Sequence, residues 1–491
     1  MSERSLARAL VLAALLVAFG AAWRASFDTL DDAFISFRAV HNAVAGRGLT
    51  FNAGAPPVES FSNPLFVFLL VPFAALGVPL PIAAALLGAI GLGLAVIAVH
   101  RLARAADLGE LASAAALSAT LGATPLVYFG LTGLETGLYA GLLAAALARS
   151  VARGSADPLA CALWALAALS RPEAPLPVLL GLAALAPRPL RARDVVPLLV
   201  VVGALAALEL ARITYYGDVV PNTFHAKPPG TADHDPTTFG PLAGLRYVAR
   251  FALALGLVLP LGALFAVRER MGVPALRGAV ALVLGGLVFA LYAGGDWMPM
   301  GRYLVPFVPF VALAGAAGIE ALSQRGIVRP ALALGLAGAA ALAGSTDQLV
   351  ELVLHADEFP YHVMGSRDSI AAIERMRPHL PAGARVVTFR IGALGDVGGY
   401  HVIDLLGLVD RRIAHIAAST PGYHPQRTRM GDDVPALRSL VRDEDPDAVL
   451  LVTYAEGPLD PAITLYDLRF AFADAYPIGR DQRWALYVRE R

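Results

Sequence analysis

The stretch DDAFISFR, residues 31–38, places two adjacent aspartates, Asp31 and Asp32, a few residues after the first apolar run of the chain. Ionisable side chains are rare inside a bilayer and mark functional positions where they occur near one. An acidic pair at the mouth of an apolar bundle therefore predicts chemistry at a membrane surface, on a substrate carried by lipid.

Composition places the whole chain in the membrane class. Of its 491 residues 57% are hydrophobic and 16% are charged, and the mean hydropathy is +0.62, which predicts a polytopic α-helical membrane protein. The 39 basic and 39 acidic residues balance, so no overall field favours nucleic acid. Cys161 is the single cysteine, which rules out an intrachain disulfide and argues against a cysteine-based metal site.

Apolar runs long enough to cross a hydrocarbon layer of about 30 Å recur up to residue 345 and then stop. The first run follows Arg4 and Arg8, and a cleaved signal peptide is the alternative interpretation of it. We predict about eleven transmembrane helices, at 6–23, 81–99, 111–128, 136–149, 158–170, 174–187, 195–212, 250–267, 278–293, 303–320 and 329–345.

Arginines cluster in alternate connections between these spans, and the positive-inside rule assigns such connections to the cytoplasm. This distribution predicts an N-terminus inside and a C-terminus outside. The apolar stretch 63–81 contains four prolines, and treating it as a span would put every arginine-rich loop outside. We therefore predict that it forms an interfacial helix on the outer leaflet.

With this topology, the polar residues that stand out lie on the outer side, whereas the spans carry almost no ionisable groups. A transporter of polar cargo usually has charges near the midplane, so this distribution favours an active site at the outer surface. The candidates are the acidic pair in the first external loop, 24–80, and the following residues: Glu59, Glu135, Arg171, Glu173, Asp218, Asn222, His225, Lys227, Asp296 and Arg302.

Hydropathy falls after residue 345, which divides the chain into a transmembrane domain, 1–345, and an extracytoplasmic domain, 346–491. Period-two and amphipathic patterns predict that the second is a small α/β domain, with strands at 386–389, 402–405, 448–452 and 485–488 and helices at 366–379 and 434–442. The glycine-rich segment 391–396 lacks the full dinucleotide fingerprint, so we predict a tight turn from strand to helix.

Six segments, in order along the chain, resemble the GT-C superfamily of polyprenyl-phosphate-sugar-dependent glycosyltransferases, and most closely the cell-wall arabinofuranosyltransferases. The segments are DDAFISFRAVHNAVAGRGLTFNAGAPPVESFSNPLF (31–66), GLTGLETGLYA (130–140), SRPEA (170–174), YYGDVVPNTFHAK (215–227), GGDWMPMGRYLVP (294–306) and IGALGDVGGYHVIDLLGLVD (391–410). The resemblance implies a GT-C-like fold in the bacterial cytoplasmic membrane, with the acidic pair in an external active site. It implies a polyprenyl-phosphate sugar as donor and a cell-envelope glycan or lipid as acceptor. Arabinofuranose is one candidate for the sugar.

The departing phosphate is already a good leaving group, so the reaction needs no strong general acid, unlike a glycosidase reaction that releases an alcohol. It needs a base for the acceptor hydroxyl and a cation for the phosphate. We assign Asp31 as the base that takes the proton of the acceptor hydroxyl, and Asp32 as the neighbour that orients hydroxyl groups. The opposite assignment stays open. So does a purely structural role, as a helix N-cap followed by a first-turn acid.

A positively charged side chain should bind the phosphate. Our first candidate for this role is Lys227, the only lysine of the chain, followed by Arg302 and Arg171. A divalent metal is one more candidate for the cation beside the acidic pair. The alternatives are structural: Arg302 pairs with Asp296, Arg171 pairs with Glu173, and Glu59 and Glu135 are solvated acids. His225 faces the phosphate or only covers apolar surface. The rival class of function is a polyprenyl-linked lipid transporter or flippase.

Overall fold

The computed structural model describes residues 2–26, 28–187, 189–226, 241–355, 364–419, 434–454, 456–480 and 482–490. The chain divides into two compact units, each assembled from three segments. The first, which we call the helical unit, contains Met1–Phe27, Pro81–Glu209 and Pro229–Val353. The second, which we call the mixed unit, contains Asp28–Leu80, Leu210–Pro228 and Leu354–Arg491.

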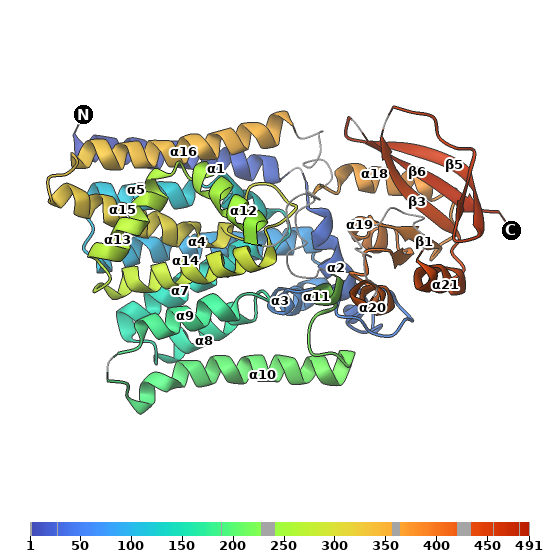
Figure 1. Ribbon diagram of the computed structural model, residues 1–491, viewed down its shortest axis with the longest axis horizontal. Helices are drawn as coiled ribbons and strands as arrows, with labels where there is room; N and C mark the ends of the chain where they lie inside the picture. Colours follow the sequence, from blue (N-terminus) through green and yellow to red (C-terminus); the bar gives the residue numbers. More distant parts are fainter. Residues whose placement is uncertain are drawn as a thin grey trace. The chain divides into compact units, whose positions relative to one another are not determined.

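The helical unit is built from long apolar helices, drawn in Figure 1. One of them, α10 (Val196–Tyr216), begins in the helical unit and ends in the mixed unit. The other helices are α1 (Glu3–Ala25), α4 (Leu80–Ala105), α5 (Glu110–Leu121), α6 (Thr124–Leu131), α7 (Thr136–Arg153), α8 (Pro158–Ala168), α9 (Pro175–Leu185), α12 (Pro241–Ala254), α13 (Val258–Glu269), α14 (Pro274–Ala293), α15 (Val308–Gln324) and α16 (Pro330–Leu354), with short 3₁₀ turns at Ala192–Val195 and Val305–Phe307.

Among the described residues, five helices are long and apolar enough to cross a membrane, and seven spans result if each of two bent pairs counts as one. The bent pairs are α5 with α6, at 43°, and α12 with α13, at 104°. The helices α8 and α9 are shorter, with 11 residues each. Length and composition therefore support several spans, and the count of eleven stays a prediction.

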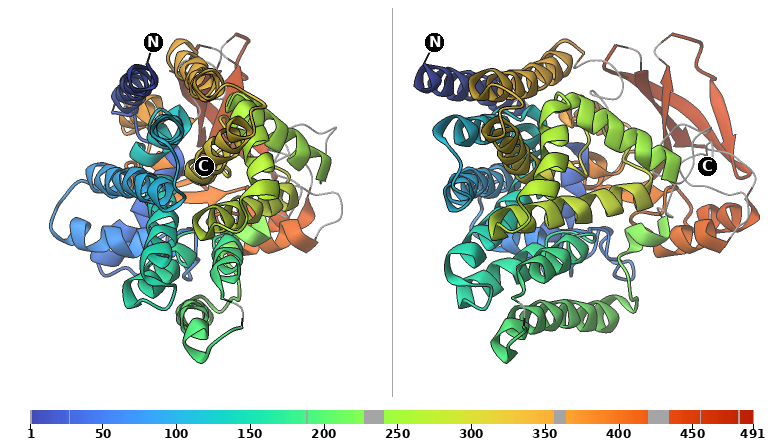
Figure 2. Two further views of the ribbon diagram at one scale, coloured as in Figure 1. Left: turned by 90° about the vertical axis from the view of Figure 1, so that its left-hand side faces the viewer. Right: turned by 60° about the vertical axis from the view of Figure 1, so that its left-hand side comes forward.

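Helices from the two ends of the helical unit pack together in parallel. A Cβ atom on Gly335 or Gly338 of α16 would lie 2.9 or 3.0 Å from Leu6 or Leu10 of α1, and the contacts advance in the same direction along both helices. The blue α1 and the orange α16 lie side by side in Figure 2. Small residues let membrane helices approach closely, so this contact ties the start of the helical unit to its end.

The mixed unit contains one six-stranded sheet, with the strand order β2-β1-β3-β6-β5-β4. The first three strands in that order pair in parallel, and the remaining pairs are antiparallel. The strands are β1 (Arg385–Thr388), β2 (His401–Asp404), β3 (Ala448–Tyr454), β4 (Ala462–Leu465), β5 (Leu468–Ile478) and β6 (Gln482–Arg489). The helices are α2 (Asp31–Val44), α3 (Pro64–Ala75), α11 (Asn222–Ala226), α18 (Arg367–Met376), α19 (Gly392–Asp396), α20 (Arg411–Ser419) and α21 (Pro435–Asp443).

The four predicted strands of the C-terminal region are confirmed as β1, β2, β3 and β6, and the two predicted helices as α18 and α21. The hairpin β4–β5 and the helix α20 were not predicted. In the stretch 63–81 the structure has α3, whose 12 residues rise about 18 Å and so fall short of a 30 Å layer. The helix α16 passes through residue 345 to Leu354, and the division into 1–345 and 346–491 stays a prediction.

Candidate functional site

The carboxylate of Asp31 is fixed by the backbone of a helix that lies far away in the sequence. Asp31 is the first residue of α2, and its Oδ1 and Oδ2 accept hydrogen bonds from the N–H groups of Ala393 and Gly392, at 3.0 and 3.2 Å. These are the first N–H groups of α19, which have no partner inside that helix. The N-cap of α2 is Leu30, so the alternative in which Asp31 caps its own helix is wrong.

The close contact between α2 and α19 requires a glycine. A Cβ atom on Gly392 would lie 2.0 Å from the carbonyl oxygen of Asp31, so any other residue would push the two helices apart. A second contact lies further along both helices, where His41 Nδ1 is 2.7 Å from Asp396 Oδ1, and this hydrogen bond raises the pKa of His41. A short connection from strand to helix is present as predicted, although residues 392–396 of the segment 391–396 are themselves helical, and Gly392 allows the approach of α2.

Asp31 is 8% exposed, and burial raises the pKa of its carboxyl group, although Arg390 and the two backbone N–H groups partly oppose this effect. Asp32 follows on the same helix and is half-buried. A carboxylate that is held in one orientation and has a raised pKa is a better proton acceptor than a solvated one. The arrangement therefore suits Asp31 for the role of a base.

The loop after α2 is bound to the edge of the sheet by one amide side chain. Asn52 donates to the carbonyl oxygen of Val402 at 2.8 Å and accepts from the N–H of Val402 at 3.1 Å, so it pairs with β2 as a neighbouring strand would. Asn52 is 6% exposed. The contact covers an edge strand and holds the loop next to α19.

Glu59 is buried and paired, so the interpretation of Glu59 as a solvated acid is wrong. Arg212, near the end of α10, donates to both oxygens of Glu59 at 2.6 and 3.2 Å. The neighbouring Asn222 donates its side-chain amide to the carbonyl oxygens of Gly407 and Leu408, at 2.6 and 3.0 Å. These bonds join the segment around α11 to the loop before α20, and they give Glu59 and Asn222 structural partners.

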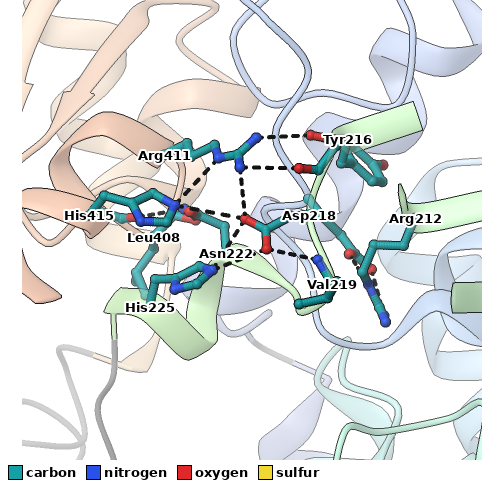
Figure 3. Close-up of polar contacts among 12 residues, drawn as sticks. Arg212, Tyr216, Asp218, Val219, Asn222, His225, Leu408, Arg411 and His415 are labelled. Carbon is teal, nitrogen blue, oxygen red and sulfur yellow. Dashed lines mark hydrogen bonds and ion pairs between the residues drawn. The ribbon is translucent and has the colours of Figure 1, made fainter. Parts of the chain in front are cut away.

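Asp218 and His225 lie in contact with each other, as Figure 3 shows. His225 Nε2 is 3.2 and 3.3 Å from the two carboxylate oxygens of Asp218, and Arg411 and His415 of α20 complete the cluster. His225 is therefore more than a cover for apolar surface. Lys227, the predicted partner of the phosphate, lies outside the described residues.

A buried ion cluster in the helical unit contains three of the predicted residues. Arg171 donates to Glu135 at 2.5 Å and also to Glu173, and the three residues are 7–8% exposed. The predicted pair of Arg171 with Glu173 is confirmed. Glu135 is not a solvated acid, because it lies on the other side of the same guanidinium group.

The predicted pair of Arg302 with Asp296 is also confirmed, at 2.5 Å, and both residues are 9% exposed. Tyr303 lies between this pair and the Arg171 cluster, since the guanidinium carbons of Arg302 and Arg171 are 5.5 and 5.9 Å from its ring centre. Both guanidinium groups are thus already paired with carboxylates and lie near an aromatic ring, so they are less available to bind a phosphate.

The mixed unit also has a cavity of about 860 Å³. Its lining includes Tyr215, at the end of α10, and a set of charged residues: Arg385, Asp410, Arg411, Arg412 and Glu444. Charged donors and acceptors together with an aromatic residue suit a ligand rich in hydroxyl groups.

Asp404 is a buried carboxyl group that sequence reasoning placed only in a strand. It is 0% exposed and accepts the N–H groups of Leu406 and Val409 at 2.9 and 3.1 Å. Burial raises the pKa of Asp404 to about 7, above its unfolded value of 3.8. Charging this group opposes folding, so its contribution to stability is fully present below pH 3.8 and is lost as the pH rises through about 7.

We therefore expect the stability of the protein in detergent to fall between about pH 4 and pH 7, with a weaker fall in the Asp404→Asn variant. Thermal unfolding followed by intrinsic fluorescence at several pH values measures both curves. We compare the slopes of melting temperature against pH and not the absolute values. The amide of the variant replaces one acceptor oxygen by a donor, which changes the stability at every pH. Parallel curves for wild type and variant would show that Asp404 does not titrate in this range.

Comparison with known proteins finds a matching domain family and a similar solved structure. Residues 361–487 match a domain of unknown function, DUF8728, and no curated protein matches the sequence. Among solved structures, the chain is similar to ArnT from Cupriavidus metallidurans in the apo state, with a TM-score of 0.55 and 15% sequence identity. The likeness covers 97% of this chain and 96% of ArnT. Both units, from the first apolar helix to the C-terminal sheet, are thus parts of one ArnT-like fold.

Proposed function

We propose that the protein is an integral membrane glycosyltransferase of the GT-C type, which moves a sugar from a polyprenyl-phosphate donor to a glycan or lipid acceptor of the cell envelope. ArnT is a glycosyltransferase of this type, and the likeness extends over almost the whole chain. The observation that carries the proposal is the carboxylate of Asp31, which the N–H groups of Gly392 and Ala393 hold in place.

In this proposal Asp31 takes the proton of the acceptor hydroxyl, whose oxygen forms a bond to the sugar carbon while the bond between that carbon and the phosphate oxygen breaks. The proton goes to the carboxylate, and the bonding electron pair leaves with the phosphate. Asp32 orients acceptor or sugar hydroxyl groups. Fixed orientation costs no reorganisation during the reaction, which is the main benefit of a preorganised site.

Lys227 is our proposed cation for the phosphate. The choice rests on the resemblance of the segment that contains it and on the pairing of the two arginines. Arg171 and Arg302 already meet Glu135, Glu173 and Asp296, so we propose that they stabilise the helical unit and do not bind the phosphate directly.

The acceptor, in our proposal, uses the cavity of about 860 Å³ in the mixed unit. Arabinofuranose is the proposed sugar, on the family resemblance alone. A flippase for the same lipid is the second candidate. The predicted spans argue against it, because their few ionisable residues lie near the span ends and not near the midplane.

The test is a transfer assay on purified protein in detergent, with a panel of radiolabelled polyprenyl-phosphate pentoses and hexoses and a cell-envelope extract as acceptor. Product formation with one donor, abolished in Asp31→Asn, is the expected result. A protein that moves the intact lipid across liposome membranes but forms no product with any donor is a flippase, and the proposal is then wrong.

For the orientation we propose a cytoplasmic N-terminus and an outer mixed unit, on the distribution of arginines. The test starts from Cys161→Ala, which removes the buried free cysteine, and adds one cysteine at Ser155 or Ser419. An impermeant maleimide should label intact cells at position 419 and not at position 155. The reverse pattern contradicts the orientation.

A further inference from the structure

Three side chains with metal-binding atoms meet in the mixed unit, close to the end of α10. Asp218 lies in the turn between α10 and α11, His225 lies on α11, and His415 lies on α20. One ligand atom from each, a carboxylate oxygen and two ring nitrogens, lies within 4.8 Å of the others. Figure 3 shows the two imidazole rings and the carboxylate turned toward one another.

The spacing of these atoms fits a tetrahedral ion. Zinc bonds to oxygen and nitrogen of about 2.0–2.1 Å place neighbouring tetrahedral ligands about 3.3 Å apart. His225 Nε2 is 3.2 Å from Asp218 Oδ2, and His415 Nε2 is 3.8 Å from the same oxygen. Small rotations of the side chains would bring all three atoms to bonding distance of one ion.

The surroundings hold the three side chains in place. Arg411 donates to the carbonyl oxygens of Tyr216 and Gly217, both at 3.1 Å, and so fixes the turn that carries Asp218. Asp218 Oδ1 also accepts the N–H of Val219 at 2.8 Å. Ligand groups that are oriented by outer-shell hydrogen bonds are typical of metal sites.

Arg411 Nε lies 3.4 Å from His415 Nε2, and an ion at this site would take the place of that hydrogen bond. A buried oxygen is available nearby as well. Asn222 lies one turn before His225 on α11 and is 4% exposed, and its Oδ1 has no hydrogen-bond partner within the described part of the chain.

We propose that Asp218, His225 and His415 bind one divalent transition-metal ion of the zinc class, with water in the fourth position. Two imidazoles and one carboxylate suit zinc, whereas magnesium and calcium prefer oxygen ligands. The ion would connect α20 with the turn that follows α10. It would thereby stabilise the part of the cavity lining that includes Arg411. The competing interpretation is a metal-free cluster in which Arg411, 3.4 Å from Asp218, supplies the positive charge.

The experiment uses full-length protein in detergent, stripped with chelator and then passed through a desalting column after addition of ZnCl₂. We expect one zinc per chain by elemental analysis, a higher melting temperature with zinc, and a visible absorption band when Co²⁺ replaces zinc. Asp218→Asn, His225→Gln and His415→Gln should each weaken zinc binding by more than the roughly 10–100-fold that loss of an outer-shell partner causes.

His401→Gln is the matched control, because His401 lies in the same unit, lines the cavity that Arg411 also lines, and is 3.7 Å from a carboxylate oxygen of Glu444. It should keep the zinc. Wild-type protein that retains no zinc and shows no change in melting temperature overturns the proposal without any need for the variants. Equal loss of zinc in His401→Gln and His225→Gln also overturns it, since the ion then lies elsewhere. Neither result depends on sugar transfer.

Discussion

Asp31→Asn is expected to slow sugar transfer by about a hundredfold or more, the usual cost of removing a general base. The amide cannot take a proton from the acceptor hydroxyl, although it has the same size as the carboxylate. One of the two N–H groups of α19 also loses its acceptor, because the side-chain nitrogen of the introduced asparagine is a donor. Initial rates with the active donor, together with melting temperatures, separate the chemical effect from the structural one.

Asp28→Asn provides a matched control for that structural effect. Asp28 Oδ1 accepts the backbone N–H groups of Ser366 and Arg367 at 3.0 and 3.2 Å, at the start of α18, as Asp31 does for α19. Loss of such a cap costs about 1 kcal/mol, and we expect transfer to stay near the wild-type rate. If Asp31→Asn behaves in the same way as Asp28→Asn, Asp31 is only a cap and the role of base passes to Asp32.

The acidic limb of the pH–rate profile gives an independent readout. A base must be ionised, and burial raises the pKa of Asp31 above the ordinary aspartate range. The wild-type turnover should therefore rise with pH through that raised pKa, whereas the residual rate of Asp31→Asn should lack this limb. A purely structural effect on α19 would lower the rate and leave the limb unchanged.

The second large effect is expected from Arg171→Met, which leaves Glu135 and Glu173 buried with no guanidinium between them. Breaking a buried ion pair by removing one partner typically costs about 3–5 kcal/mol, because a buried charge remains uncompensated. We expect a much lower melting temperature in detergent and little folded protein after heating at a temperature that the wild type survives. Fluorescence-detected gel filtration after heating measures both.

Two further variants identify the cause. If the cost comes from the uncompensated carboxylates, adding Glu135→Gln and Glu173→Gln to Arg171→Met should restore much of the stability. Arg149→Met breaks an ion pair with Asp157 in which the arginine side chain is 36% exposed, and it should leave the melting temperature almost unchanged. A triple variant no more stable than Arg171→Met would mean that packing of the guanidinium, not charge, holds this part of the helical unit.

The sequence supports much of the architecture, because apolar runs and period-two strands are local signals. It predicted the helical class, a helix in the stretch 63–81 that does not span the membrane, and the strands β1, β2, β3 and β6. The hairpin β4–β5 was not predicted. Its strand β5 contains Asp474, Pro477 and a register shift between Phe472 and Asp474, which interrupt the alternation of apolar and polar residues. The bend of 104° between α12 and α13 was not predicted either, because the two helices form one continuous apolar run in the sequence.

The partners of the site residues were not predictable, since each contact joins segments far apart in the chain. Asp31 was identified from its position after the first apolar run, but nothing near it in sequence points to Gly392 as its neighbour. Likewise, Glu59 is visible as an acid in the first external loop and Arg212 as a charge at a span end, and only the fold shows that they pair. Pairs two or six residues apart, such as Arg171 with Glu173 and Arg302 with Asp296, were within reach of sequence reasoning.

The three-segment construction of the mixed unit also constrains the timing of biogenesis. Asp31 and the backbone N–H of Gly392 are 361 positions apart, which a ribosome adding about 5–20 residues per second takes roughly 20–70 s to bridge. During that interval α2 is already synthesised, while α19 and most of the sheet do not yet exist. A nascent or prematurely terminated chain therefore holds the acidic pair without the backbone that fixes it, and under the proposed function it is inactive until α19 has folded.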